Sequence, residues 1–213
     1  MSVEIEDLAL LKKCRQFSPS GDSCAVLGDC RFAMGIDSFK KEMAFKTVDT
    51  FDINGSPTYK VNLNEALKSE FHGKYNWVID SGTLYCCFDI NTVWENMLNL
   101  LTASGSIAHT GNLSGFFGRG FYSLSPALFR DFYNANNFAI NCTASKTRQS
   151  LAWKTFNPNH TYLASPDFSF GLSDSNYTPS IPNDSMIFCH ATREFPSKFE
   201  KPTPQHFIDT DGR

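Results

Sequence analysis

Residues 75–88 read YNWVIDSGTLYCCF, and this stretch decides how the rest of the chain is interpreted. Large apolar residues lead up to Asp80, and Ser81 and Gly82 follow directly. A short apolar run that ends at loop residues is typical of a buried strand in a parallel sheet. In open α/β sheets, ligands bind at the edge where such strands end. The stretch therefore predicts a strand over residues 76–80 that places Asp80, Ser81 and Gly82 at a binding site.

The segments on either side alternate between strand and helix patterns. Further strands are predicted at residues 24–27, 46–52, 59–63, 106–110, 138–142 and 186–191, and helices at residues 2–17, 64–71, 91–101 and 126–134. The last helix has the clearest start, because Ser125 can accept hydrogen bonds from free amides and Pro126 has no amide hydrogen to lose. This alternation predicts one α/β domain over residues 1–213, a mostly parallel sheet with helices on both faces.

Composition narrows the classes of protein that fit. The chain has 213 residues, 41% of them hydrophobic and 14% aromatic, which suffices for one large core. Its net charge is −3 and its 19 basic residues are scattered, so we expect no nucleic-acid partner. No apolar run reaches the roughly 18 residues of a membrane span, and the first residues are acidic, unlike a signal peptide. We therefore expect a cytoplasmic protein that does not bind membranes.

The seven cysteines indicate reduced thiols, because an odd number does not suit a disulfide framework. Their spacing lacks the short pairs that zinc ligands favour, so no metal site is expected.

Two further stretches carry a resemblance to a known family. Residues 118–129 read GRGFYSLSPALF, where relatives read approximately GHGFYQFSPELF, and residues 80–88 read DSGTLYCCF, similar to DxGTLEHVF. Over residues 24–138 the chain resembles a subgroup of class I S-adenosylmethionine (AdoMet) dependent methyltransferases. The resemblance implies a Rossmann-like seven-stranded sheet whose last strand is antiparallel, and AdoMet as the cofactor.

The resemblance also implies which residues bind the adenosine part of the cofactor. In the family an acidic residue ends the second strand and holds the ribose, because a carboxylate can accept two hydrogen bonds from vicinal hydroxyls. Asp52 fits that position, with Asp49 as the alternative register. Ten residues after Asp52, Asn62 and Leu63 stand where relatives contact the adenine.

The methionyl part of the cofactor would lie against two loops. The first strand is followed by Gly28 and, with few further glycines, by Arg31, which could hold the cofactor carboxylate. By the resemblance, Asp80, Ser81 and Gly82 border the same end of the cofactor. Asp80 could instead simply cap the turn that follows it.

The acceptor side departs from the family pattern, since Tyr85 and Cys86 replace a Glu-His pair. Tyr85 is a candidate catalytic or substrate-contacting residue. His109, near the end of the fifth strand, is either a general base or a buried core histidine. The resemblance places three further residues against the acceptor, namely Asn112, Arg119 and Tyr122.

Two segments flank this core. Residues 1–21 form the N-terminal helical segment, which we expect to pack on the sheet. Residues 143–185, rich in aromatic residues and prolines, form an insertion or lid before the last strand. It either covers the substrate or decorates the sheet edge.

Three functions remain open on the sequence. The leading hypothesis is methyl transfer from AdoMet to a small-molecule or glycan acceptor. The alternative is a non-catalytic protein that keeps the methyltransferase fold as a binding or scaffold module. A nicotinamide dinucleotide enzyme is disfavoured because the chain has no GxGxxG motif. The oligomeric state is not predicted.

Overall fold

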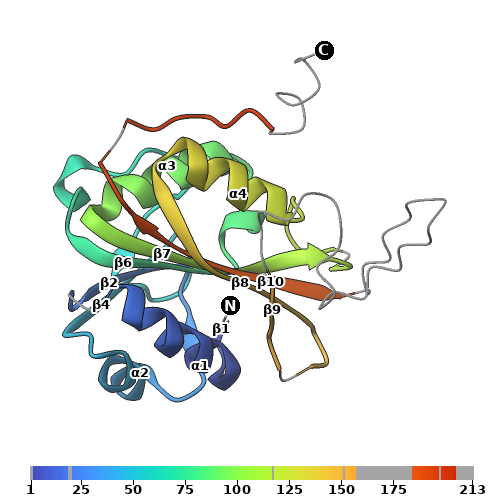
Figure 1. Ribbon diagram of the computed structural model, residues 1–213. Coiled ribbons are helices and arrows are strands. Elements are labelled where there is room, and N and C mark those ends of the chain that lie inside the picture. Colours follow the sequence, from blue (N-terminus) through green and yellow to red (C-terminus); the bar gives the residue numbers. More distant parts are fainter. Residues whose placement is uncertain are drawn as a thin grey trace, which may run out of the picture.

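The computed structural model describes residues 2–18, 21–116, 118–150, 152–156, 184–196 and 198–204. Its centre is an eight-stranded sheet with strand order β5-β4-β2-β6-β7-β10-β8-β9 (Figure 1). The strands are β2 (Ser23–Leu27), β4 (Thr47–Asp52), β5 (Tyr59–Lys60), β6 (Tyr75–Ser81), β7 (Leu101–Ser114), β8 (Phe138–Thr147), β9 (Lys154–Phe156) and β10 (Ser185–Arg193). A separate two-stranded parallel sheet joins β1 (Ser2–Val3) to β3 (Arg31–Phe32).

Strand directions agree with the predicted α/β fold. Strands β5, β4, β2, β6 and β7 pair in parallel, and β10 is antiparallel to both β7 and β8. The antiparallel strand near the end of the chain is thereby confirmed. The sheet has one strand more than predicted, because β9 folds back antiparallel on β8.

Helices cover both faces of the sheet. Helices α1 (Ile5–Cys14) and α2 (Ile36–Met43) lie on one face, and α3 (Ile90–Leu100) and α4 (Pro126–Ala135) on the other (Figure 1). Short 3-10 helices complete the set, namely η1 (Arg15–Phe17), η2 (Ser69–Phe71) and η3 (Leu84–Cys86). Each face has its own apolar core.

Strand β6 lies at the centre of the sheet, and its apolar run packs against both helical layers. Successive side chains of a strand point to opposite faces. Val78 therefore packs in the core under α3 and α4, whereas Trp77 and Ile79 pack in the core over α1 and α2. All three side chains are buried, as expected for a strand with helices on both sides.

The predicted helix over residues 64–71 is wrong, and Asn96 is the reason. The buried Asn96 side chain on α3 accepts a hydrogen bond from Leu67 N (2.9 Å) and donates to Leu63 O (3.1 Å) and Glu65 O (2.8 Å). These backbone groups are thus held in a turn at residues 63–65 and in the irregular stretch after it, and only η2 is helical. A side chain remote in sequence overrides the local helix pattern.

Other differences concern the lengths of elements. Helix α2 was not predicted, and β5 covers two residues instead of residues 59–63. Strands β7 and β8 are longer than predicted, because β10 pairs with both along nearly its whole length. The predicted start of α4 is confirmed, since Ser125 Oγ accepts a hydrogen bond from Leu128 N at 3.2 Å. In the described part of the chain, no helix is long and apolar enough to cross a membrane.

We predict that Asn96→Ala lowers the free energy of unfolding by about 3 kcal/mol, because it leaves three backbone groups without partners, two of them buried and one partly buried. Urea denaturation followed by circular dichroism measures the change. Asn91→Ala on the same helix is the control: no side-chain hydrogen bond is recorded for Asn91, so it changes stability by less than about 0.5 kcal/mol. Equal losses in the two variants would contradict this role of Asn96.

Candidate functional site

A cleft of about 350 Å³ lies where β6 and β7 end. Strand β6 contributes Ser81, β7 contributes Gly111 and Asn112, and the loop after β6 contributes Gly82 and Tyr85. The remaining lining residues come from the N-terminal segment, from β7, from the segment after β7 and from the ends of β8 and β10: Ser2, Glu4, Glu6, Asp7, Thr110, Phe116, Arg119, Lys146, Arg148 and Met186. The cleft thus lies at the sheet edge where β6 ends, the edge at which the sequence of residues 75–88 predicted a binding site.

Tyr85 packs in the cleft wall against Gly120, where no side chain fits. A Cβ atom on Gly120 would lie 2.3 Å from Tyr85 Cδ2. Gly120 also has a φ of +74°, which favours glycine. Burial raises the pKa of Tyr85, so its phenol stays protonated near neutral pH and cannot serve there as a base.

Asn112 and the nearby Arg119 and Tyr122 were all predicted to face the acceptor. Asn112 and Arg119 do line the cleft. The Asn112 side chain is 5% exposed, its Nδ2 donates to Tyr122 O at 3.5 Å, and its Oδ1 has no hydrogen-bond partner. The Tyr122 hydroxyl donates to Phe88 O at 2.7 Å, at the exposed rim.

The opposite wall of the cleft comes from the N-terminal segment. Lys146 Nζ is buried between Glu6 Oε1 (3.0 Å) and Asp7 Oδ1 (3.8 Å). Ser81 Oγ donates to Ser2 O at 2.7 Å, which ties this segment to the end of β6. The sequence did not predict this wall of the cleft. The N-terminal segment was expected only to pack on the sheet, and Lys146 belonged to the predicted insertion.

Asp80 is enclosed in the protein and does not line the cleft. It is completely buried, and its Oδ1 accepts from Thr83 N (2.7 Å) and Leu84 N (3.0 Å). Its Oδ2 bonds His109 Nδ1 at 3.1 Å. Asp80 therefore caps the turn, as the alternative from the sequence allowed, and its predicted contact with a cofactor stays a prediction.

His109 is a core histidine. It is completely buried, its ring lies tilted against that of Trp94 with centroids 4.7 Å apart, and its Nε2 bonds the hydroxyl of the buried Tyr133 at 2.6 Å. Both ring nitrogens are thus engaged within the core and do not line the cleft, and the general-base role of His109 stays a prediction.

The predicted ribose-binding residue lies beside the first loop. Asp52 ends β4, and its Oδ2 and Oδ1 accept from Asp29 N (2.6 Å) and Asn54 N (3.0 Å). Gly28 directly follows β2 and has a φ of +97°. The alternative residue, Asp49, lies within β4 and accepts from the Tyr75 hydroxyl at 2.9 Å, so the choice of Asp52 for the ribose stays the prediction. A carboxylate offers about four acceptor sites, so Asp52 retains two for a ligand.

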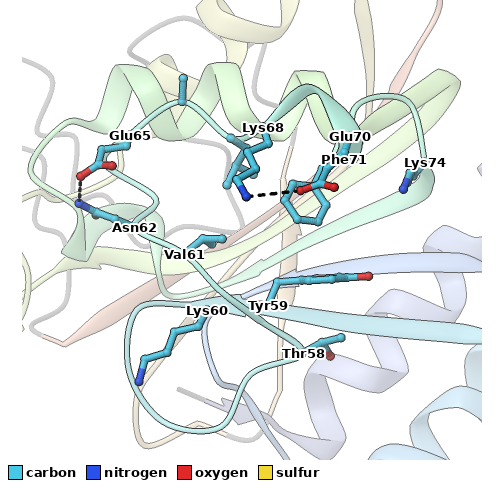
Figure 2. Close-up of a pocket in the computed structure, with 12 residues that line it drawn as sticks. Thr58, Tyr59, Lys60, Val61, Asn62, Glu65, Lys68, Glu70, Phe71 and Lys74 are labelled. Atoms are coloured by element: carbon cyan, nitrogen blue, oxygen red, sulfur yellow. Dashed lines mark hydrogen bonds and ion pairs between the residues drawn. The ribbon is translucent and has the colours of Figure 1, made fainter.

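The other predicted cofactor residues lie apart from the cleft. Asn62 lines a second groove of about 570 Å³ at the outer edge of the sheet, where Figure 2 shows its side chain paired with Glu65 (2.7 Å). Leu63 is buried in the core. Arg31 is exposed on β3, where it pairs with Ser2 of β1. The structure thus groups Gly28 with Asp52, and Ser81 and Gly82 with the acceptor residues.

Parts of the sequence predictions lie outside the described residues. The predicted insertion over residues 143–185 begins later than expected, because β8 continues to Thr147, and residues 157–183 are not described. Within the described ranges, no cluster of His, Cys, Asp and Glu side chains could hold a metal ion.

Comparisons with known proteins bear on the fold. No family model and no curated protein matches the sequence. Among solved structures, the Bradyrhizobium japonicum N-methyltransferase NodS, in complex with S-adenosyl-L-homocysteine, superposes with a TM-score of 0.52 and 10% identity over 90% of this chain and 89% of that one. A Mesorhizobium loti S-adenosylmethionine dependent methyltransferase gives 0.52 and 13%, over 88% and 98%.

A third match is the 1,6-didemethyltoxoflavin-N1-methyltransferase of Burkholderia thailandensis, with a TM-score of 0.54 and 9% identity over 87% of this chain and 77% of that one. The chain has the class I methyltransferase fold. In this fold the cleft at the ends of β6 and β7 adjoins the ends of β2 and β4, where Gly28 and Asp52 lie. The site residues therefore occupy one continuous edge of the methyltransferase fold.

We predict that Tyr133→Phe lowers the free energy of unfolding by about 2 kcal/mol, because His109 Nε2 then lacks a partner in the core while the ring packing is kept. Tyr122→Phe is the matched control, since its hydroxyl bonds Phe88 O at the exposed rim, and it changes stability by less than about 1 kcal/mol. Urea denaturation of both variants measures the difference, and equal effects would argue against the buried network.

Proposed function

We propose that the protein binds AdoMet across the ends of β2 and β4 and transfers its methyl group to a small-molecule or glycan acceptor held in the cleft. The observation that carries this proposal is that Asp52 and Gly28, at the ends of β4 and β2, lie on the same edge of the sheet as the cleft at the ends of β6 and β7, the edge where open α/β sheets bind ligands. The complexes of NodS and of the Burkholderia enzyme with S-adenosylhomocysteine support the cofactor.

The residues at this edge fit the parts of the cofactor. The free lone pairs of Asp52 suit the vicinal ribose hydroxyls, and Gly28 leaves the end of β2 without a side chain. Ser81 and Gly82 line the cleft at the end of β6, on the side where the methyl group would be delivered. AdoMet, when bound, supplies a methyl group that is already activated on a sulfonium.

For methyl transfer from a sulfonium, the main tasks of the protein are to position the acceptor and to exclude water. Tyr85 remains protonated, and Asn112 cannot remove a proton, so these two residues act by orientation rather than as bases. An acceptor whose nucleophile is reactive without deprotonation suits this site better than a simple alcohol. Tyr85 and Asn112 are the residues that would orient it.

One observation favours a second function, a non-catalytic binding protein. In place of a second glycine, Asp29 follows Gly28, and its Oδ2 accepts from Ser56 N at 2.9 Å. This contact closes the loop after β2 onto the loop after β4 and puts a negative charge near the region that a cofactor carboxylate would occupy. Failure to bind AdoMet is the outcome this alternative predicts.

Calorimetric titration with AdoMet and S-adenosylhomocysteine tests the two functions. We predict saturable binding of both ligands to the wild-type protein, weakened roughly 10- to 100-fold by Asp52→Asn, because the amide loses charge-assisted bonds to the ribose. Asp49→Asn is the matched control, since the same charge is removed three positions earlier on β4, inside the sheet, and affinity should change less than about twofold.

Thermal melts establish that each variant is folded before it is titrated. If neither ligand binds the folded wild-type protein at millimolar concentration, the methyltransferase proposal fails and the non-catalytic alternative stands. Equal weakening by Asp49→Asn and Asp52→Asn would remove Asp52 from the cofactor site.

A further inference from the structure

We propose that Cys14 and Cys142 form a peroxide-sensitive thiol pair, and that their oxidation to a disulfide ties helix α1, and with it the N-terminal wall of the cleft, to strand β8. Cys14 ends α1, and Cys142 lies within β8. All seven cysteines of the chain are free thiols in the structure. The inference concerns thiol chemistry and does not depend on methyl transfer.

The two thiols meet in the core between the sheet and helices α1 and α2. The Cys14 side chain is 1% exposed within this core, and the partly exposed Cys142 packs against the same core. The Cys14 thiol forms a hydrogen bond with the sulfur of Cys142. Two cysteines that touch in the folded state can form a disulfide without a large movement of the backbone.

The neighbouring Cys189 does not compete for Cys142. In the pairing of β10 with β8, Cys189 stands opposite Thr143, one position along from Cys142. Its side chain, however, packs in the core under α3 and α4, on the other face of the sheet. The sheet thus separates Cys189 from the pair, and Cys14 is the thiol that Cys142 can reach in its own core.

Cys142 is the more reactive thiol of the pair. The hydrogen bond from Cys14 lowers the pKa of Cys142 against the opposing effect of burial, and the charge of Lys13 lowers it further. The same hydrogen bond, together with burial, raises the pKa of Cys14. Strand β9 covers residues 143–145 of β8, and residue 142 beside them keeps an exposed surface. Because peroxides react with the thiolate, Cys142 is oxidised first and Cys14 second.

The oxidant is a peroxide such as hydrogen peroxide. The Cys142 thiolate attacks one peroxide oxygen, so that an S–O bond forms, the O–O bond breaks, and the departing hydroxide takes up the thiol proton as water. The sulfur of Cys14 then attacks the sulfenic sulfur of Cys142. The S–S bond forms, the S–O bond breaks, and the proton of Cys14 leaves with the displaced hydroxide. Two thiols and one peroxide thus give one disulfide and two waters.

The disulfide would join the two elements that also build one wall of the cleft. Helix α1 carries Glu6 and Asp7, and β8 carries Lys146, which pairs with both carboxylates. All three residues line the cleft. Oxidation therefore adds a covalent link at the end of α1 to a wall whose polar contacts with β8 are ion pairs.

Mass spectrometry of the wild-type protein after peroxide treatment tests the pair. We expect the loss of two hydrogen atoms, a disulfide-linked pair of peptides that contain Cys14 and Cys142, and reversal by dithiothreitol. Cys142 should react before Cys86, although Cys86 is the exposed residue, because partial burial of its thiol and the charge of Asp80 raise the pKa of Cys86. Earlier oxidation of Cys86, a disulfide between any other pair, or no disulfide in the folded protein would overturn the proposal.

Cys14→Ala isolates the role of the hydrogen bond. In this variant Cys142 should stop at the sulfenic acid, which dimedone traps. Alkylation of Cys142 by iodoacetamide should shift to higher pH by about one unit, because the thiolate loses one hydrogen bond. Cys86→Ala is the matched control and should leave both the disulfide and this alkylation profile unchanged. An unshifted profile in folded Cys14→Ala would contradict the pairing, and the peptide map of the wild-type protein decides if that variant does not fold.

Hydrogen exchange measures the effect on the wall of the cleft. Oxidation should slow amide exchange within residues 5–14 of α1 and leave residues 36–43 of α2, on the same face of the sheet, unchanged. Cys142→Ala, treated in the same way, should show no change in either helix. Equal slowing in both helices, or none in α1, would show that the disulfide does not act on the wall. None of these results depends on AdoMet, so they separate this inference from the proposed function.

Discussion

The buried Asp80 carboxylate is the constraint on which the rest of the structure depends. Burying a polar group at the centre of a core is costly unless hydrogen bonds within the protein replace those that it made with water. Here two backbone amides of the following turn and the ring of His109 supply them. The carboxylate therefore fixes the turn after β6, the position of β7 through His109, and α4 through Tyr133.

This use of Asp80 changes what the cleft can do. Because the Asp80 side chain is used by the scaffold, the polar groups that line the cleft come from other residues. Tyr85 packs closely against Gly120, and Asn112 of β7 lines the same cleft. The turn that Asp80 holds sets where both side chains stand, although Asp80 touches neither the solvent nor the cleft.

Local patterns were sufficient for the central strands and for α4, because an apolar run between two helical layers and a Ser125 cap act within a few residues. They failed at residues 64–71, where Asn96, some thirty positions away, decides the backbone. They also missed Lys146 and Arg148 at the cleft, since the pairing that extends β8 to Thr147 comes from β10, the last strand in the sequence. The sequence also left open whether His109 is a general base or a core histidine, and the structure shows its ring buried in the core.

The position of β10 has a consequence for how the protein is made. This strand lies between β7 and β8 and pairs with both, yet it is the last of the eight to leave the ribosome. Until β10 is synthesised, β7 and β8 each expose the backbone N–H and C=O groups that pair with β10 in the folded sheet. Such unpaired strand edges promote aggregation. Completion of the sheet is thus a late, non-local step, and chains that stop before residue 185 would depend on chaperones to remain soluble.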